Sequence, residues 1–186
     1  MTVTRDDLRS YLQIPSHIGN DDNPHLDRAL AAAVEAVADY CGRTFTAPGD
    51  TATARIFRCR THPIYVDDFV EDPDTVEESS DRTSWTTVTA TWWTQPDNLE
   101  TRNVIAGWAG GPWWRVTAKW GVGPILLARV ELPTLMKAAQ IYKRRDSVNG
   151  VEGFGEFGVV RITRAADPHI AEMLDPLRRM DRAGIA

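Results

Sequence analysis

Apolar residues recur with a helical spacing in some stretches of this chain, and in others β-branched and aromatic residues indicate strands. Near the start, Leu8, Tyr11 and Leu12 recur on one helical face, and Thr4 stands three residues before Asp7. A threonine followed three positions later by an acid can close the first turn with reciprocal hydrogen bonds. This pattern predicts a short capped helix that buries those three apolar side chains.

The clearest helical pattern begins after Asn23 and Pro24, a capping residue followed by a proline suited to the first helical position. Apolar residues then recur with a period of about 3.6, and alanine is frequent. Gly42 stands where a helix end favours a left-handed residue. The predicted buried stripe is Leu26, Leu30, Ala33, Val34, Val37 and Cys41.

From about Thr44 to about Trp120 the chain is rich in β-branched and aromatic residues, punctuated by turn formers. This stretch predicts a small antiparallel sheet inserted between helices. The predicted strands are Ala54–Cys59, Ile64–Val66, Thr75–Glu77, Thr86–Trp93, Asn103–Ile105 and Trp113–Lys119.

Helical patterns return after this stretch. Pro133 predicts the first turn of a helix with Leu135, Ala139 and Tyr142 on one face, and Asp167-Pro168 predicts a last helix. The expected fold class is therefore α+β, mainly a helical bundle with an inserted β-rich region. We expect a single domain, with a helical core at 1–50 and 121–186 and the insert at 51–120.

A glycine-rich segment, Gly150–Gly158, follows the predicted Pro133 helix and carries Val151, Phe154 and Phe157. Ordering such a backbone costs conformational entropy, which burial of the two phenyl rings could offset. We therefore expect these rings to be buried against another protein subunit.

Composition excludes several classes of protein. At 186 residues and 42% hydrophobic, the chain can bury a core, while its net charge of -5 argues against a surface that wraps nucleic acid throughout. Cys41 and Cys59 lack metal-ligand spacing, which favours a reducing compartment without a disulfide. The N-terminus is charged where a signal peptide is apolar, and no segment approaches the roughly 20 apolar residues of a membrane span, so we expect neither export nor membrane contact.

Seven tryptophans include the neighbouring pairs Trp92-Trp93 and Trp113-Trp114. They could form an aromatic platform for sugars, peptides or single-stranded nucleic acid. Neighbouring side chains in a strand point to opposite faces, so we expect one member of each pair in the core and the other at an edge or interface.

No motif for catalysis or metal binding stands out. Four scattered histidines lack metal-ligand partners, and the glycines of Gly150–Gly158 follow a helix rather than a strand. An acidic run lacks the spacing of a calcium loop, so we interpret it as a solvated face. We expect no enzyme, cofactor or metal. The run comprises Asp67, Asp68, Glu71, Asp72, Asp74, Glu77, Glu78 and Asp81, and the histidines are His17, His25, His62 and His169.

Short motifs follow one another through nearly the whole chain. They are an LxxYL helix, an alanine-rich helix ending YCGRTF, a β-rich insert with IYVDDF and WWTQPDN, the strand VTAKWG, a helix ending YKRRDS before GVEGFGEFG, and the terminal DPHIAEMLDPLRRM. This ordered set resembles the head-tail connector (adaptor, head-completion) proteins of long-tailed phages. The chain departs from their pattern at Val122–Glu131, which looks like an extra segment before the Pro133 helix.

The resemblance implies a structural virion protein at the head-tail junction, made in the host cytoplasm. It implies a homo-oligomeric, dodecameric ring beneath the portal protein, on which stopper or tail-completion proteins assemble, with passing contact to genomic DNA in the channel. By position, the C-terminal region would dock on the portal. The residues assigned to the portal or a neighbouring subunit are Arg144, Arg145, Val151, Phe154, Phe157, Leu174, Pro176, Leu177, Arg178 and Arg179.

Two other functions are compatible with the residues. The tryptophan-rich sheet could serve a carbohydrate- or peptide-binding module. Alternatively, Asp67 or Asp68 could belong to the site of a small hydrolase.

Overall fold

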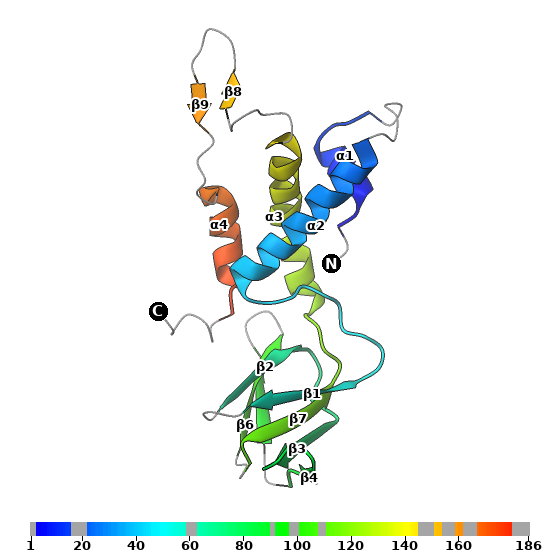
Figure 1. Ribbon diagram of the computed structural model, residues 1–186, viewed down its shortest axis with the longest axis vertical. Coiled ribbons are helices and arrows are strands. Elements are labelled where there is room, and N and C mark those ends of the chain that lie inside the picture. Colours follow the sequence, from blue (N-terminus) through cyan, green and yellow to red (C-terminus); the bar gives the residue numbers. More distant parts are fainter. Residues whose placement is uncertain are drawn as a thin grey trace. The chain divides into compact units, whose positions relative to one another are not determined.

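The computed structural model has the expected α+β fold, and the residues that it describes form four α-helices and small antiparallel sheets (Figure 1). Two compact units make up the chain. The β unit contains Arg43–Ala128, and the helical unit contains Thr2–Gly42 and Arg129–Met180. The prediction that the chain forms a single domain stays a prediction. The structure describes residues 3–15, 22–58, 63–89, 92–96, 101–107, 111–144, 151–153, 159–161 and 167–179.

Helix α1 (Arg5–Tyr11) begins with the predicted capping box. The Thr4 hydroxyl accepts from the Asp7 backbone N–H at 3.2 Å, and the Asp7 carboxylate accepts from the Thr4 backbone N–H at 2.7 Å. Leu8 is fully buried, as predicted, but Tyr11 is 44% exposed, so its predicted burial was wrong. Its ring lines an open groove between α1 and the third helix instead.

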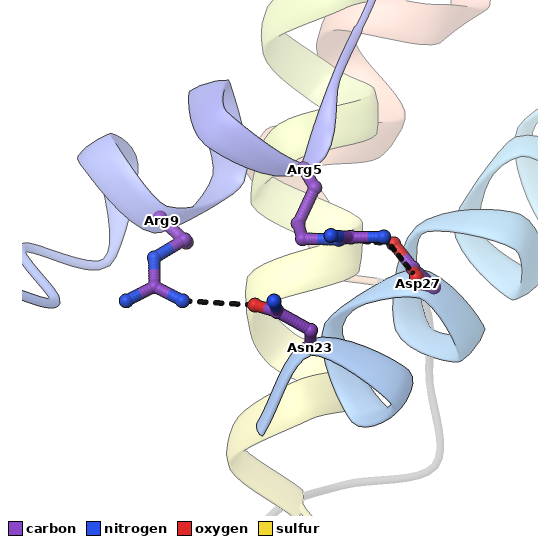
Figure 2. Close-up of polar contacts among 4 residues, drawn as sticks. All are labelled: Arg5, Arg9, Asn23 and Asp27. Carbon is purple, nitrogen blue, oxygen red and sulfur yellow. Dashed lines mark hydrogen bonds and ion pairs between the residues drawn. The ribbon is translucent and has the colours of Figure 1, made fainter. Parts of the chain in front are cut away.

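Helix α2 (Asn23–Cys41) ends at Gly42, which has the predicted left-handed conformation with φ of 67°. Asp22, rather than Asn23, is the residue before the first helical turn. Charged side chains join α1 to α2, since the Arg5 guanidinium makes two hydrogen bonds to Asp27 and Arg9 donates to the Asn23 side chain at 2.9 Å (Figure 2). The buried residues of α2 are Leu26, Ala29, Ala33, Val37 and Cys41, while Leu30 and Val34 are half-buried.

Helix α3 (Pro124–Lys143) begins nine residues before the predicted start, and Pro133 lies inside it. The segment Val122–Glu131 therefore supplies its first turns. Two prolines suit a first helical position here, and burial favours the earlier one, because Leu126 and Val130 continue the buried stripe of Ala138 toward the N-terminus. Pro133 cannot donate a backbone hydrogen bond, and the neighbouring Thr134 hydroxyl donates to the Val130 carbonyl at 2.7 Å.

Helix α4 (Pro168–Leu174) starts at the predicted cap, where the Asp167 carboxylate accepts from the His169 backbone N–H at 3.0 Å. Pro176 ends the regular helix, and a single 3₁₀ turn, η4 (Asp175–Leu177), follows.

In the described part of the β unit, seven strands form two antiparallel sheets whose inner faces share one core. The order in sheet A is β1-β7-β3-β4, and in sheet B it is β2-β6-β5. The predicted strand Thr86–Trp93 was wrong as one element, because its two ends belong to different sheets. The bounds are β1 (Thr53–Arg58), β2 (Ile64–Phe69), β3 (Thr75–Ser79), β4 (Thr86–Thr87), β5 (Trp92–Pro96), β6 (Arg102–Gly107) and β7 (Trp113–Ala118).

Aromatic side chains fill the core between the sheets. Trp114 is fully buried, and the Trp120 ring lies 5.6 Å from the Phe57 ring and 6.1 Å from the Phe69 ring. Gly121 follows with a φ of +153°, and a side chain there would lie 2.5 Å from the Pro48 nitrogen. The tight approach of these backbones requires glycine.

Candidate functional site

Two antiparallel strands flank the glycine-rich segment as a hairpin: β8 (Val151–Gly153) lies at its start and β9 (Val159–Arg161) directly after it (Figure 1). Val151 pairs with Arg161, and Gly153 pairs with Val159. Within the described part of the chain, these strands pair only with each other. A two-stranded hairpin is marginally stable on its own in water, so this one needs other contacts to be well ordered.

Several predicted partner-binding residues come from this region. Arg144 is exposed just beyond the end of α3, and Val151 is the first residue of β8. The predictions for Arg145, Phe154 and Phe157 fall outside the described residues. The expected burial of the two phenyl rings against another subunit stays a prediction.

The predicted portal-docking segment folds back on the end of α2 within the helical unit. Leu174 and Leu177 are buried there, with 3% and 2% of their surface exposed, whereas Pro176 and Arg178 are exposed. The Arg179 backbone N–H donates to the Cys41 carbonyl at 2.9 Å. Of the assigned residues in this segment, Pro176 and Arg178 are therefore the exposed ones that a partner can contact.

Tyr40 anchors this segment. Its hydroxyl donates to the Asp175 carboxylate at 2.6 Å, and the Arg178 guanidinium lies 5.5 Å from the centre of its ring. The hydrogen bond to Asp175 raises the pKa of Tyr40 above its ordinary value of 10.0, with a further contribution from partial desolvation.

Replacing Tyr40 with phenylalanine should lower the free energy of unfolding by about 0.5–1 kcal/mol, since it removes a charge-assisted but half-exposed hydrogen bond. Because the folded pKa is the higher one, this contribution is complete below pH 10.0 and is lost as the pH rises through the folded pKa. Urea unfolding of both proteins across pH 8 to 12 measures the difference. An equal difference over the whole range would mean that the phenol proton does not contribute.

Of two hollows in the described helical unit, only one reaches the size of an ordinary small-molecule site. The one between α2, α3 and α4 measures about 80 Å³, well below the roughly 300–1,000 Å³ of ordinary small-molecule sites. The groove between α1 and α3 measures about 380 Å³, and its Asp7 already accepts hydrogen bonds from Thr4. Among the residues that the structure describes, no three His, Cys, Asp or Glu side chains converge as a metal site.

The tryptophan pairs divide between core and surface, as the strand pattern predicts. Trp114 is fully buried while Trp113 is half-buried, and Trp92 packs against the core while Trp93 is 59% exposed. Trp93 shares the outer face of sheet B with Tyr65, which is 48% exposed. The β unit therefore presents aromatic side chains on its surface.

Solved structures share this fold at low sequence identity. A chain in the neck of an empty gene transfer agent (GTA) particle, computed with C6 symmetry, matches with a TM-score of 0.57 and 16% identity, covering 96% of this chain and 90% of that chain. A chain of the native GTA neck, computed with C12 symmetry, gives 0.52 and 15%, covering 94% and 87%. A chain of the native GTA virion gives 0.55 and 17%, covering 96% and 90%.

This chain has the fold of those particle chains. At such identities the agreement concerns the fold alone. No protein-family model and no curated protein matches the sequence. In the described part of the chain, no helix combines the length and apolar character needed to cross a bilayer.

The acidic run was wrongly interpreted as a wholly solvated face. Asp68 is only 6% exposed, and its carboxylate lies 3.7 Å from the equally buried Arg43 guanidinium. Asp67 pairs with Arg55 at 2.7 Å, and Glu77 holds Arg115 through two hydrogen bonds of 2.6 Å. Asp67 and Asp68, the candidate hydrolase residues, thus form ion pairs in the β unit.

Sequence reasoning missed that Arg43 and Asp68 meet inside the β unit. Arg43 closes the YCGR motif, and Asp68 stands in IYVDDF; the Asp68 carbonyl also accepts from the Gly121 backbone N–H at 2.7 Å. The signal available beforehand was an arginine directly after a helix-ending glycine, together with an acid that continues the alternate positions of Ile64 and Val66 in a strand. That signal predicts buried charge but does not pair the two residues.

Proposed function

We propose that this chain is a structural component of the neck of a phage-like particle. In this role it is an adaptor that forms a ring beneath the portal and joins the portal to the stopper or tail-completion proteins. The observation that carries the proposal is the fold shared over 94% or more of the chain with chains of GTA necks and of a GTA virion. The role is non-enzymatic, at the head-tail junction of the virion.

Ring formation needs a heterologous interface, in which one surface of each subunit meets a different surface of the next. The GTA neck structures were computed with C6 and C12 symmetry, which supports a closed ring and is compatible with a dodecamer. The β8–β9 hairpin supports a partner in this region, because its strands pair only with each other among the described residues. We assign Arg144, Arg145, Val151, Phe154 and Phe157 to this contact.

The segment from Leu174 to Arg179 is the proposed portal-docking element. Pro176 and Arg178 would meet the portal directly, while the buried Leu174 and Leu177 hold the segment on α2. Exposed Arg178 lies above the Tyr40 ring, so its guanidinium is partly pre-oriented before a partner arrives.

Replacing Arg178 with glutamate should weaken binding to purified portal rings by about tenfold or more, because it reverses the charge of a side chain assigned to the portal contact. Arg28→Glu is the matched control, since Arg28 is an exposed arginine of α2 away from this segment. Surface plasmon resonance with immobilised portal rings measures both. If wild-type protein does not bind the portal at high concentration and electron microscopy finds no ring on the portal, the proposed adaptor function is wrong.

The exposed Trp93 and Tyr65 favour one alternative, a carbohydrate- or peptide-binding module. Such a module should change its tryptophan fluorescence with members of a glycan or peptide panel, and Trp93→Ala should abolish the change. A flat response across the panel removes the alternative.

A further inference from the structure

One face of sheet A carries opposite charges at its two ends. Alternate residues of β7 and the residue just beyond it, Trp113, Arg115, Thr117 and Lys119, point away from the core, while Trp114, Val116 and Ala118 are buried. We call the outward surface along these four residues the outer stripe. Ile56 of β1 pairs with Arg115 and adds an apolar side chain that is 46% exposed.

Two arginines stack on one tryptophan at the first end of the outer stripe. The Arg82 guanidinium lies 4.7 Å from the Trp113 ring centre, and the Arg58 guanidinium lies 5.6 Å from it. Both arginines are exposed, and neither pairs with a carboxylate among the described residues. This cationic end differs from the middle of the stripe, where Glu77 neutralises Arg115.

The turn before β4 fixes Arg82 in its position. Arg82 has a φ of 68°, which is uncommon for a residue with a side chain. The Ser79 hydroxyl accepts from the Arg82 backbone N–H at 2.8 Å, and the Asp81 carboxylate accepts from the N–H groups of Thr83 and Ser84 at 2.8 and 2.9 Å. Asp81 is therefore engaged by the turn, and the Arg82 side chain is held over Trp113 by a conformation that costs free energy.

Carboxylates gather at the other end. Lys119 donates to Glu71 at 3.0 Å, and the Asp74 backbone N–H donates to the Thr117 carbonyl at 2.8 Å, which places Asp74 beside the same stripe. The charges of Asp74 and Asp50 also raise the pKa of Lys119, and all three acids are exposed. One ammonium group faces three carboxylates, which leaves a net negative charge at this anionic end.

The two ends cannot satisfy each other within one copy. Trp113 and Lys119 lie six residues apart on one extended strand, a separation of about 20 Å at roughly 3.4 Å per residue. A second copy can bring them together, because the cationic end of one copy fits the anionic end of the next. The surfaces in such a contact differ, so it is heterologous and can continue from copy to copy.

We propose that the Arg58–Trp113–Arg82 end of the outer stripe docks on the Asp50–Glu71–Asp74 end of a neighbouring copy. This contact presupposes the proposed ring. It would be one of the surfaces through which neighbouring subunits of that ring meet. Exposed Ile56 beside Arg115 adds apolar surface along the same stripe. The overall charge of -5 favours this occupant over nucleic acid, since long-range repulsion would oppose a polyanion.

Charge exchange between two variants of the full chain tests the contact. The first variant, Arg58→Glu/Arg82→Glu, makes both ends anionic, and the second, Glu71→Lys/Asp74→Lys, makes both ends cationic. Arg28→Glu/Arg129→Glu is the matched control for the first variant, because it changes the net charge by the same amount and in the same direction at exposed helical positions. Circular dichroism and thermal melting check that each variant is folded.

Sedimentation velocity up to millimolar protein measures association at ionic strengths of about 0.01 M and about 1 M, where the Debye length is about 30 and 3 Å. Wild type and control should associate beyond the dimer at low ionic strength, and each variant alone should associate at least about tenfold more weakly. An equimolar mixture of the two variants should recover the wild-type assemblies, and high salt should weaken all of them.

Three results would overturn the contact. They are a wild-type chain that stays monomeric to millimolar concentration, association that both variants retain, and a mixture that does not recover. A single-stranded oligonucleotide that binds wild type but not the first variant, without self-association, would assign the cationic end to nucleic acid instead. The proposed adaptor function is contradicted only if wild-type protein also fails to bind the portal. A failure of the copy-to-copy contact can therefore be distinguished from a failure of the adaptor function.

Discussion

Replacing Asp68 with alanine should lower the free energy of unfolding by about 3–5 kcal/mol, because it leaves the Arg43 charge buried without the carboxylate beside it. The two side chains are only 4% and 5% exposed, and the charged atoms lie 3.7 Å apart. Desolvating a charge is costly, and the remaining contacts of Arg43 cannot replace a full opposite charge. Urea denaturation followed by tryptophan fluorescence measures the loss.

The adjacent Asp67 supplies the matched control. Its carboxylate pairs with Arg55 at 2.7 Å, but both side chains are about half exposed, at 50% and 46%. Asp67→Ala should therefore cost no more than about 1 kcal/mol. The double variant Arg43→Met/Asp68→Leu should recover much of the stability lost by Asp68→Ala, since it removes both charges. Equal losses at Asp67 and Asp68 would contradict a buried ion pair.

Substitution of Gly121 with alanine should destabilise the chain by about 3 kcal/mol or more. The backbone strain at φ of +153° alone costs about 1–3 kcal/mol. The new methyl group would also lie 2.5 Å from the Pro48 nitrogen and 2.7 Å from the Ala47 carbonyl carbon, so the backbone must move. That movement would disturb the hydrogen bonds from Gly121 to Asp68 and from Val122 to Thr46, of 2.7 and 2.9 Å.

Gly49→Ala tests whether the effect is specific. A side chain at Gly49 would meet only the Thr51 carbonyl oxygen at 3.9 Å, an ordinary contact. Alanine there should change the free energy of unfolding by less than about 1 kcal/mol, and it can stabilise by restricting the unfolded chain. Differential scanning calorimetry compares the two variants. A Gly121→Ala protein as stable as Gly49→Ala would mean that the two backbones do not approach so closely.

Local signals in the sequence predict most of the secondary structure. The Thr4–Asp7 capping box, the left-handed Gly42 and the Asp167 cap each depend on residues within one turn of chain, and the structure confirms all three. Most strand positions follow in the same way from β-branched runs and turn formers, with Thr86–Trp93 the exception. The predicted helix start at Pro133 is wrong because Pro124 carries the same local signal, and only tertiary burial of Leu126 and Val130 separates the two.

Long-range pairing accounts for what the sequence did not predict. The meeting of Arg43 with Asp68 depends on how β2 lies beside the segment that follows α2, and no local pattern encodes that. The same holds for Tyr40 and Asp175, which are 135 residues apart. For the candidate interfaces, the alternation of a strand predicted that one member of the Trp113-Trp114 pair would be buried and the other not, but it did not say which. The stacking of Arg58 and Arg82 on Trp113 follows from the register of three segments.

The proline inside α3 has a mechanical consequence. Pro133 has no N–H to donate to the Arg129 carbonyl, so one rung of the ladder between successive turns is missing. A long helix bends most cheaply where such a rung is absent. Helix α3 can therefore bend at Pro133, so that the angle between the axes of Pro124–Leu132 and Thr134–Lys143 changes with little loss of free energy.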